Sequence, residues 1–178
     1  LWAMLGGVVQ ILATMLLVHM FTLRNFAVGT AYSKTEPVQA AIFGAIILGE
    51  HVTLGAVGAI IVGIAGVILI SIARVPLSWA SFRSALVSRT ALTGILSGAL
   101  FGISAVAYRS ASLSLGGPEP IMQAAVTLAV VSTFQTVVMV VWMAWTDVGE
   151  FGRVARAWKS STLVGLAGIV GSACWFTA

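Results

Sequence analysis

Charged residues are scarce in this sequence, which excludes an ordinary soluble protein. Only 8% of the 178 residues are charged and 60% are hydrophobic, and the mean hydropathy is +1.08. A formal net charge of +4 would suggest a nucleic-acid partner in a soluble protein. Here the basic residues lie between apolar runs, and no basic stripe is interleaved with aromatic residues. The sequence therefore predicts an integral membrane protein, with the lipid bilayer as partner and no nucleic acid.

Cysteines and enzyme motifs are equally scarce. Cys174 is the only cysteine, so no intramolecular disulfide can form. The patterns GxxxxGK[ST], HExxH, CxxC and GxSxG are absent, and His19 and His51 have no metal-ligand spacing. We therefore expect no enzyme, no cofactor and no metal centre, and any transport would be driven by a gradient. Because the chain opens without Met and stops inside an apolar run, we expect it to be a piece of a longer protein.

Long apolar runs fill most of the chain and predict an all-α fold, a polytopic transmembrane helix bundle. A helix needs about 20 mostly apolar residues to cross a hydrocarbon core of about 30 Å. The apolar positions do not alternate as those of a membrane β-barrel do. The six segments that meet or approach this length are Leu1–Leu23, Ala27–Gly49, Thr53–Ala73, Ala91–Tyr108, Ile121–Trp145 and Leu163–Ala178.

Two further features accompany the apolar runs: stripes of small residues, and two connections that mix aromatic with basic residues. Small residues at four-residue spacing predict close packing between helices. They are Gly55, Ala59 and Gly63 in one span and Gly94, Gly98 and Gly102 in another. Residues 75–90 and 149–160 combine aromatic residues at helical spacing with Arg or Lys, which fits either short helices at the membrane interface or plain loops.

Charged side chains inside the second span are the strongest sign of function. Along a helix, Glu36 and Lys34 lie about 21 and 24 Å from Glu50, inside a core about 30 Å thick. An uncompensated charge near the bilayer centre costs about 2.5–3.5 kcal/mol, so we expect both to face the bundle interior or an aqueous cavity. Pro37 is expected to break the helix there, as happens at transporter substrate sites. Glu36 would be either a proton carrier or a fixed counter-charge.

Further polar side chains are expected around this pair. Tyr32, Glu36, Gln39 and Phe43 follow one stripe of the second span, and the first and fifth spans each carry a Gln and a Thr one turn apart. The Gln and Thr side chains are either pathway groups or hydrogen-bond partners between helices. The predicted substrate or ion pathway consists of Glu36, Lys34, Tyr32, Gln39, Gln10, Thr14, Gln123 and Thr127, with Pro37 as the helix break.

The order of motifs between residues 31 and 70 resembles the end of an EamA repeat. Thr35-Glu36-Pro37 opens a predicted helix, Ile47-Leu48-Gly49-Glu50 closes it, and the next helix is rich in glycine. EamA proteins belong to the drug/metabolite transporter superfamily, and the resemblance implies ten helices in two five-helix repeats of opposite orientation. The chain would then hold helices three to eight: residues 1–73 end the first repeat, 74–90 form a connecting interfacial segment and 91–178 begin the second repeat.

The chain departs from this family pattern in two ways. Lys34 and Glu36 stand where the family has small or hydroxyl residues, which favours a charged or zwitterionic substrate, or ion coupling, over general drug export. With six crossings, seven of the nine Lys and Arg residues collect on one face. The positive-inside tendency makes that face cytoplasmic, whereas a family member with cytoplasmic termini would place it outside, so these two expectations conflict.

Taken together, these patterns predict a secondary transporter, expected in a bacterial inner membrane. It would move a small polar or zwitterionic metabolite, or a drug-like solute, by alternating access. The expected partners are the bilayer and a small-molecule substrate, while a coupling proton or ion and a second copy of the chain are left open. The alternative is a non-transporting membrane module whose polar stripe binds a partner helix or a lipid.

Overall fold

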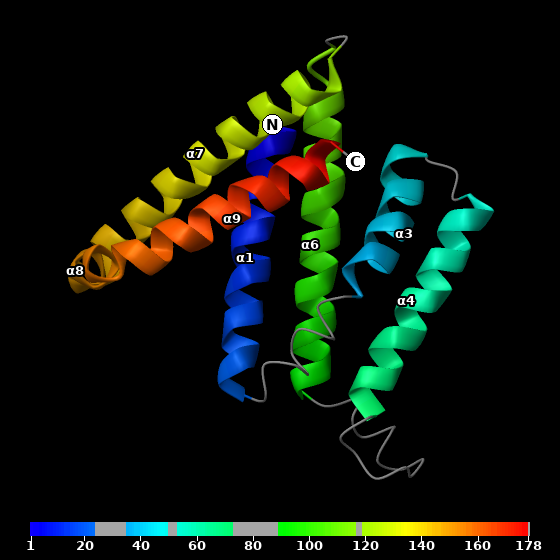
Figure 1. Cartoon of the computed structure of the whole chain (residues 1–178), viewed down its shortest axis with the longest axis horizontal. Coiled ribbons are helices and arrows are strands. Elements are labelled where there is room, and N and C mark those ends of the chain that lie inside the picture. Colours follow the sequence, from blue (N-terminus) through cyan, green and yellow to red (C-terminus); the bar gives the residue numbers. More distant parts are fainter. Residues whose placement is uncertain (24–34, 50–52, 73–88, 117–118, 178) are drawn as a thin grey trace. The chain divides into compact units, whose positions relative to one another are not determined.

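Every regular element in the described part of the chain is an α-helix (Figure 1). The computed structural model describes residues 1–23, 35–49, 53–72, 89–116 and 119–177. Three helices, α1, α6 and α7, are long and apolar enough to cross a membrane, which confirms the prediction of an all-helical membrane protein. The helices are α1 (Trp2–Leu23), α3 (Glu36–Leu48), α4 (Leu54–Ile72), α6 (Arg89–Leu113), α7 (Pro120–Thr146), α8 (Gly149–Arg156) and α9 (Trp158–Thr177).

Two helices extend beyond the apolar runs that predicted them. Helix α6 continues past Tyr108, the predicted end of its span, because the exposed Arg109 and the small residues after it are compatible with helix. The helix ends at Leu113, and after a turn at Ser114 and Leu115 the chain passes through Gly116, whose φ of 64° is one that glycine adopts without strain. Helix α9 begins at Trp158 rather than at Leu163, since no proline or glycine interrupts the polar residues between them.

Helix α3 covers only the second half of the second predicted span. Pro37 lies in its first turn, where a missing N–H costs no hydrogen bond because the first N–H groups of a helix have no partner within it. The helix has 13 residues and ends at Leu48, and its C-cap is Gly49 with a φ of 68°. A length of about 20 Å is too short for a core of about 30 Å. Residues 24–34 are outside the described residues, so the predicted break at Pro37 stays a prediction.

The two mixed connections differ in what the structure describes. Residues 149–160 form α8 and the start of α9, which favours the helical alternative over the plain loop. In the other connection only Arg89 and Thr90 are described, and they begin α6. The repeat boundary predicted at residues 74–90 therefore stays a prediction.

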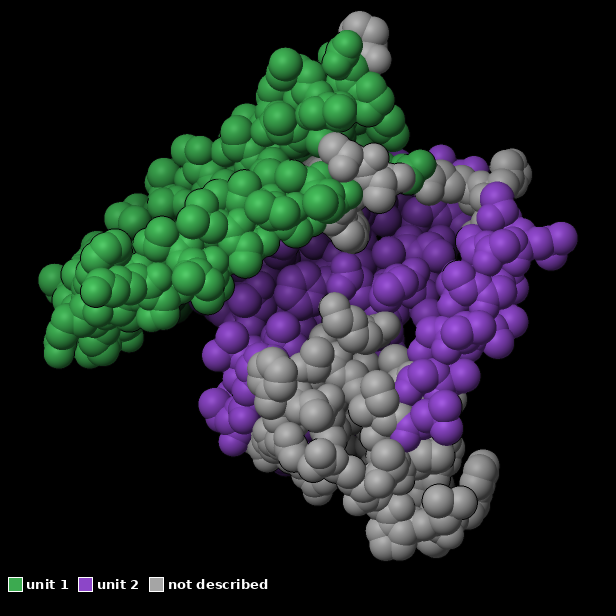
Figure 2. Space-filling view, in the orientation of Figure 1, with its two compact units in different colours: residues 1–7, 107–178 green, residues 8–106 purple. Residues whose placement is uncertain are grey.

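The chain divides into two compact units (Figure 2). Unit 1 consists of residues 1–7 and 107–178, and unit 2 of residues 8–106. Unit 2 thus contains most of α1, all of α3 and α4, and the longer part of α6. Unit 1 contains the first turns of α1, the end of α6, and α7 to α9.

Small residues bring helices together in unit 2. Ser97 of α6 is fully buried, and its Oγ donates a hydrogen bond to the carbonyl oxygen of Ala13 in α1 at 2.8 Å. A Cβ at Gly102 would lie 3.0 Å from the backbone nitrogen of Ala40, so α3 and α6 approach closely there. Gly94 and Gly98 are also buried, which confirms this stripe as a packing surface. For the stripe in α4, no described atom lies within 4 Å of a Cβ built at Gly55 or Gly63.

In unit 1, helices α7 and α9 lie side by side and α8 connects them at one end (Figure 1). Between them is a groove with a volume of about 490 Å³. Its walls are apolar except for two hydroxyl groups of α7. The lining residues are Ile121, Ala124, Ala125, Leu128, Ala129, Ser132, Thr133, Ile169 and Ala173.

Candidate functional site

Gln39 joins the first turns of α3 to α6 through its side-chain amide. Its Nε2 donates one hydrogen bond to Thr35 Oγ1 at 2.9 Å and another to the carbonyl oxygen of Ile95 at 3.3 Å. Its Oε1 is buried and accepts no hydrogen bond from the described residues. Leaving a buried acceptor unsatisfied costs about 1–3 kcal/mol. Gln39 Oε1 is therefore an acceptor placed inside the α3–α6 contact.

Glu36 adds a carboxylate to the same turn. It is the first residue of α3 and is partly exposed, and a negative charge is favourable at a helix N-terminus. Because Glu36 and Gln39 are three residues apart, they are neighbours on the helix surface. The turn thus contains a carboxylate, an unsatisfied amide oxygen and the hydroxyl of Thr35, which already accepts a hydrogen bond from Gln39. This set suits an ammonium group, or another donor, of a small polar molecule.

The other predicted pathway residues are distributed over both units. On α1, the Thr14 hydroxyl is exposed and donates to the carbonyl oxygen of Gln10 at 2.8 Å, within the same helix. On α7, Thr127 is buried and Gln123 is partly exposed. These two belong to unit 1, whereas Gln10, Thr14, Glu36 and Gln39 belong to unit 2. Their convergence on one pathway stays a prediction, and Tyr32 and Lys34 lie outside the described residues.

Unit 1 contains a polar contact that the sequence analysis missed. Gln135 of α7 donates from Nε2 to the carbonyl oxygen of Gly7 at 3.2 Å and to Tyr108 Oη at 3.4 Å. Tyr108 is only 3% exposed. The Tyr108 ring fits against α1 because Gly6 has no side chain at that point. The contact joins α1, α6 and α7. The available signal was Gln135 itself, because an amide inside an apolar span usually hydrogen-bonds across helices.

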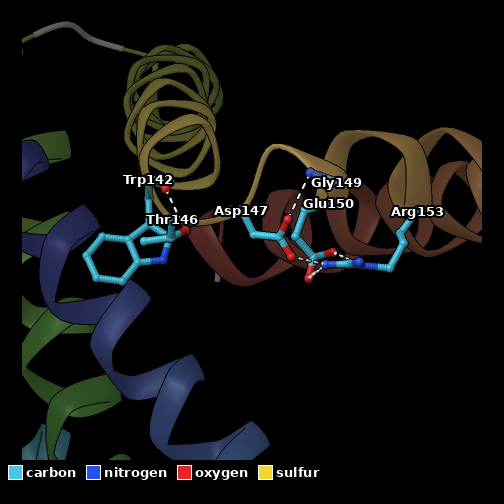
Figure 3. Close-up of polar contacts among 6 residues, drawn as sticks. All are labelled: Trp142, Thr146, Asp147, Gly149, Glu150 and Arg153. Atoms are coloured by element: carbon cyan, nitrogen blue, oxygen red, sulfur yellow. Dashed lines mark hydrogen bonds and ion pairs between the residues drawn. The ribbon is translucent and has the colours of Figure 1, made fainter.

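A charged cluster fixes the corner between α7 and α8 (Figure 3). Asp147 Oδ1 accepts a hydrogen bond from the Gly149 N–H at 2.9 Å, and the Arg153 guanidinium pairs with the Asp147 carboxylate. Arg153 also lies 2.8 Å from Glu150 Oε1 and donates from Nε to Oε2 at 3.0 Å. The hydrogen bond from Arg153 lowers the pKa of both carboxyl groups, and the Gly149 N–H lowers that of Asp147 further. The two carboxylates in turn raise the pKa of Arg153.

The charged corner is expected to titrate at a pH below the ordinary pKa of aspartate. The pKa of Asp147 is lower in the folded protein than its ordinary value of 3.8. The carboxylate therefore stabilises the corner fully above pH 3.8, and this stabilisation is lost as the pH falls through the lower pKa of the folded state. We expect the amide chemical shift of Gly149, titrated by NMR in micelles, to move with a midpoint below 3.8. Arg153→Gln should raise that midpoint, and Arg156→Gln should not. A midpoint at or above the ordinary value in the unsubstituted protein would contradict this assignment.

Neither a metal-binding cluster nor a similarity to known proteins points to a function. The described ranges contain no cluster of three or more His, Cys, Asp or Glu placed to hold a metal ion. A scan against protein-family models, a search of curated proteins and a search of solved structures each gave no match.

Proposed function

We propose that this chain is part of a secondary transporter, of the EamA type that its motifs resemble, for a small polar or zwitterionic metabolite. The observation that carries the proposal is the buried Gln39 Oε1 beside Glu36, at the start of a helix too short to cross the bilayer. Buried amide oxygens are nearly always hydrogen-bonded. Transporters build their substrate and ion sites at interrupted helices.

The chemistry of the turn fits one half of a zwitterion. Glu36 and Gln39 offer acceptors to an ammonium group, while Lys34, two residues before Glu36, would supply the cation for a carboxylate. Tyr32, four residues before Glu36 in the sequence, would add a phenol. If a proton is the coupling ion, Glu36 is the group that would carry it, since it is the only acidic residue of α3.

The packing of α3 is compatible with alternating access. Its contact with α6 is made across Gly102 and across the hydrogen bond from Gln39 to the Ile95 carbonyl oxygen. A smooth glycine surface presents few side chains that would have to repack when one helix moves along another. The two repeats would rock against each other at contacts of this kind. The membrane would be a bacterial inner membrane.

Glu36→Gln tests the proposal. The intact protein is reconstituted in proteoliposomes, and uptake of a panel of labelled amino acids and small amines is measured across a pH range. Losing a hydrogen bond to a charged group costs about 1.5–3 kcal/mol, so uptake of the transported compound should fall about 10-fold to 100-fold. The control is Glu119→Gln, which makes the same change at the exposed residue before α7. Equal uptake and pH dependence in the Glu36 variant would remove Glu36 from the mechanism.

A non-transporting membrane module is supported by a different observation. Nothing in the described chain lies within 4 Å of a Cβ built at Gly165, Gly168 or Gly171 of α9. Small helix faces of this kind suit a partner helix. This alternative predicts that no compound of the panel is taken up by the unsubstituted protein, and that chemical crosslinking through α9 recovers a second membrane protein.

A further inference from the structure

The corner that follows α7 lies where a membrane helix leaves the hydrocarbon. Helix α7 is a candidate membrane span without charged residues, and it ends at Thr146, directly before the charged cluster of Asp147. Trp142 and Trp145 precede this end, and Trp145 is 88% exposed. Tryptophan is enriched at the level of the lipid headgroups. In a bilayer that α7 crosses, this order of residues would put the start of α8 at the depth of the phosphates.

Helix α8 has the two faces of an interfacial helix. Phe151 and Val154 are exposed apolar residues three positions apart, and Trp158 follows at the start of α9 with 60% of its surface exposed. On α8, Arg153 and Arg156 repeat at the same spacing, and Lys159 follows in the first turn of α9. A helix with aromatic residues on one side and basic residues on the other lies along the boundary between headgroups and acyl chains.

The three basic residues differ in what they bind. Arg153 forms salt bridges with both carboxylates of the corner, those of Asp147 and Glu150. Arg156 donates from Nε to the carbonyl oxygen of Gly152 at 3.2 Å, which orients an exposed guanidinium group. Lys159 Nζ lies 5.8 Å from the ring centroid of Trp158. Among the described residues, no carboxylate pairs with Arg156 or Lys159, so the corner presents two uncompensated cations.

We infer that Arg156 and Lys159 bind the phosphate of an anionic phospholipid, with Trp158 held among the acyl chains beneath the headgroup. The Arg guanidinium binds phosphate oxygens through parallel N–H donors, and the Lys ammonium adds a point charge. Arg153 does not take part, because its donors hold the α7–α8 corner. This site is independent of the transport pathway proposed at Glu36.

Lipid titration of the purified chain tests the site. The chain in a neutral detergent is titrated with phosphatidylglycerol or with phosphatidylcholine, and bound lipid is counted by native mass spectrometry. Since one basic residue near an anionic surface strengthens binding about fivefold, Arg156→Gln with Lys159→Gln should weaken phosphatidylglycerol binding about 25-fold. Phosphatidylcholine binding should not change, and added salt should weaken only the phosphatidylglycerol complex.

Two further variants sharpen the result. The exchange Arg156→Lys with Lys159→Arg keeps both charges and should retain phosphatidylglycerol binding. Arg89→Gln with Arg109→Gln removes the same charge from the two exposed arginines of α6 and should leave the affinity within about twofold. Equal affinity of the unsubstituted chain for the two lipids would overturn the inference. So would unchanged phosphatidylglycerol binding in the double Gln variant.

Discussion

Gly102→Val is expected to destabilise the protein by about 2–3 kcal/mol, because the added side chain has no room between α3 and α6. A Cβ at this position would lie 3.0 Å from the nitrogen and 3.3 Å from the Cα of Ala40, and 3.4 Å from the carbonyl carbon of Gln39. All three are backbone atoms, so no change of rotamer can relieve the contact. Helix α3 must move away, and the hydrogen bond from Gln39 to Ile95 should break. Helicity followed by circular dichroism during SDS titration of detergent-solubilised protein measures the loss.

Gly58→Val is the matched control for this substitution. Gly58 also lies in an apolar helix, but no described atom is within 4 Å of its Cβ position. Its substitution should change the stability by no more than about 0.5 kcal/mol. Gly102→Ala should fall between the two, since one methyl group requires a smaller movement of α3. If Gly102→Val unfolds like the control, α3 and α6 do not approach each other as closely as described.

Gly6→Ala should have the second large effect, about 2 kcal/mol of destabilisation, although it adds only one methyl group. The Cβ would lie 2.5 Å from Tyr108 Cε1 and 2.7 Å from Cδ1, with the Ala107 Cβ at 3.2 Å. Because Tyr108 is buried, its ring cannot turn outwards without losing its packing. The displaced ring would also carry the phenol away from Gln135. Thermal unfolding in detergent, monitored by circular dichroism, measures this effect.

A double-mutant cycle separates the steric conflict from a general intolerance of alanine in α1. Tyr108→Leu removes the ring, so Gly6→Ala should cost less in that background than in the unsubstituted protein. The difference, the coupling free energy, should lie within the range of about 0.5–3 kcal/mol found for residues in contact. Gly168→Ala in α9 is the control, since nothing described lies within 4 Å of its Cβ position. Equal costs of Gly6→Ala in both backgrounds would show that Tyr108 is not the obstacle.

Local properties of the chain were sufficient to predict most of the helices. The length of an apolar run is read from consecutive residues, and the runs over α1, α4 and α7 match those helices closely. Pro37 likewise marked the first turn of α3, because proline fits the start of a helix and not its middle. The two-sided character of α8 was visible in the spacing of its apolar residues, Phe151 and Val154, against its basic residues, Arg153 and Arg156.

Contacts between helices depend on the rotation and register of one helix relative to another, and these cannot be read from the sequence of either helix alone. The stripe of Gly94, Gly98 and Gly102 and the stripe of Gly55 and Gly63 look alike in the sequence, yet only the first is buried by the described helices. For the same reason the bond from Gln135 to Tyr108 could not be predicted, since it joins α6 to α7 across 27 positions. At Gln39, the sequence indicated a polar group but not which of its atoms would find partners.

Helices α7, α8 and α9 follow one another with almost no irregular chain between them. Within residues 120–177, only Asp147, Val148 and Ala157 are not helical, and the Ala157 N–H still bonds to the carbonyl oxygens of Arg153 and Val154. Unpaired peptide groups are what makes an extended chain costly to transfer from the ribosome exit into lipid. With so few of them, the chain can turn from α7 through α8 into α9 while nearly all of its peptide groups stay paired within helices.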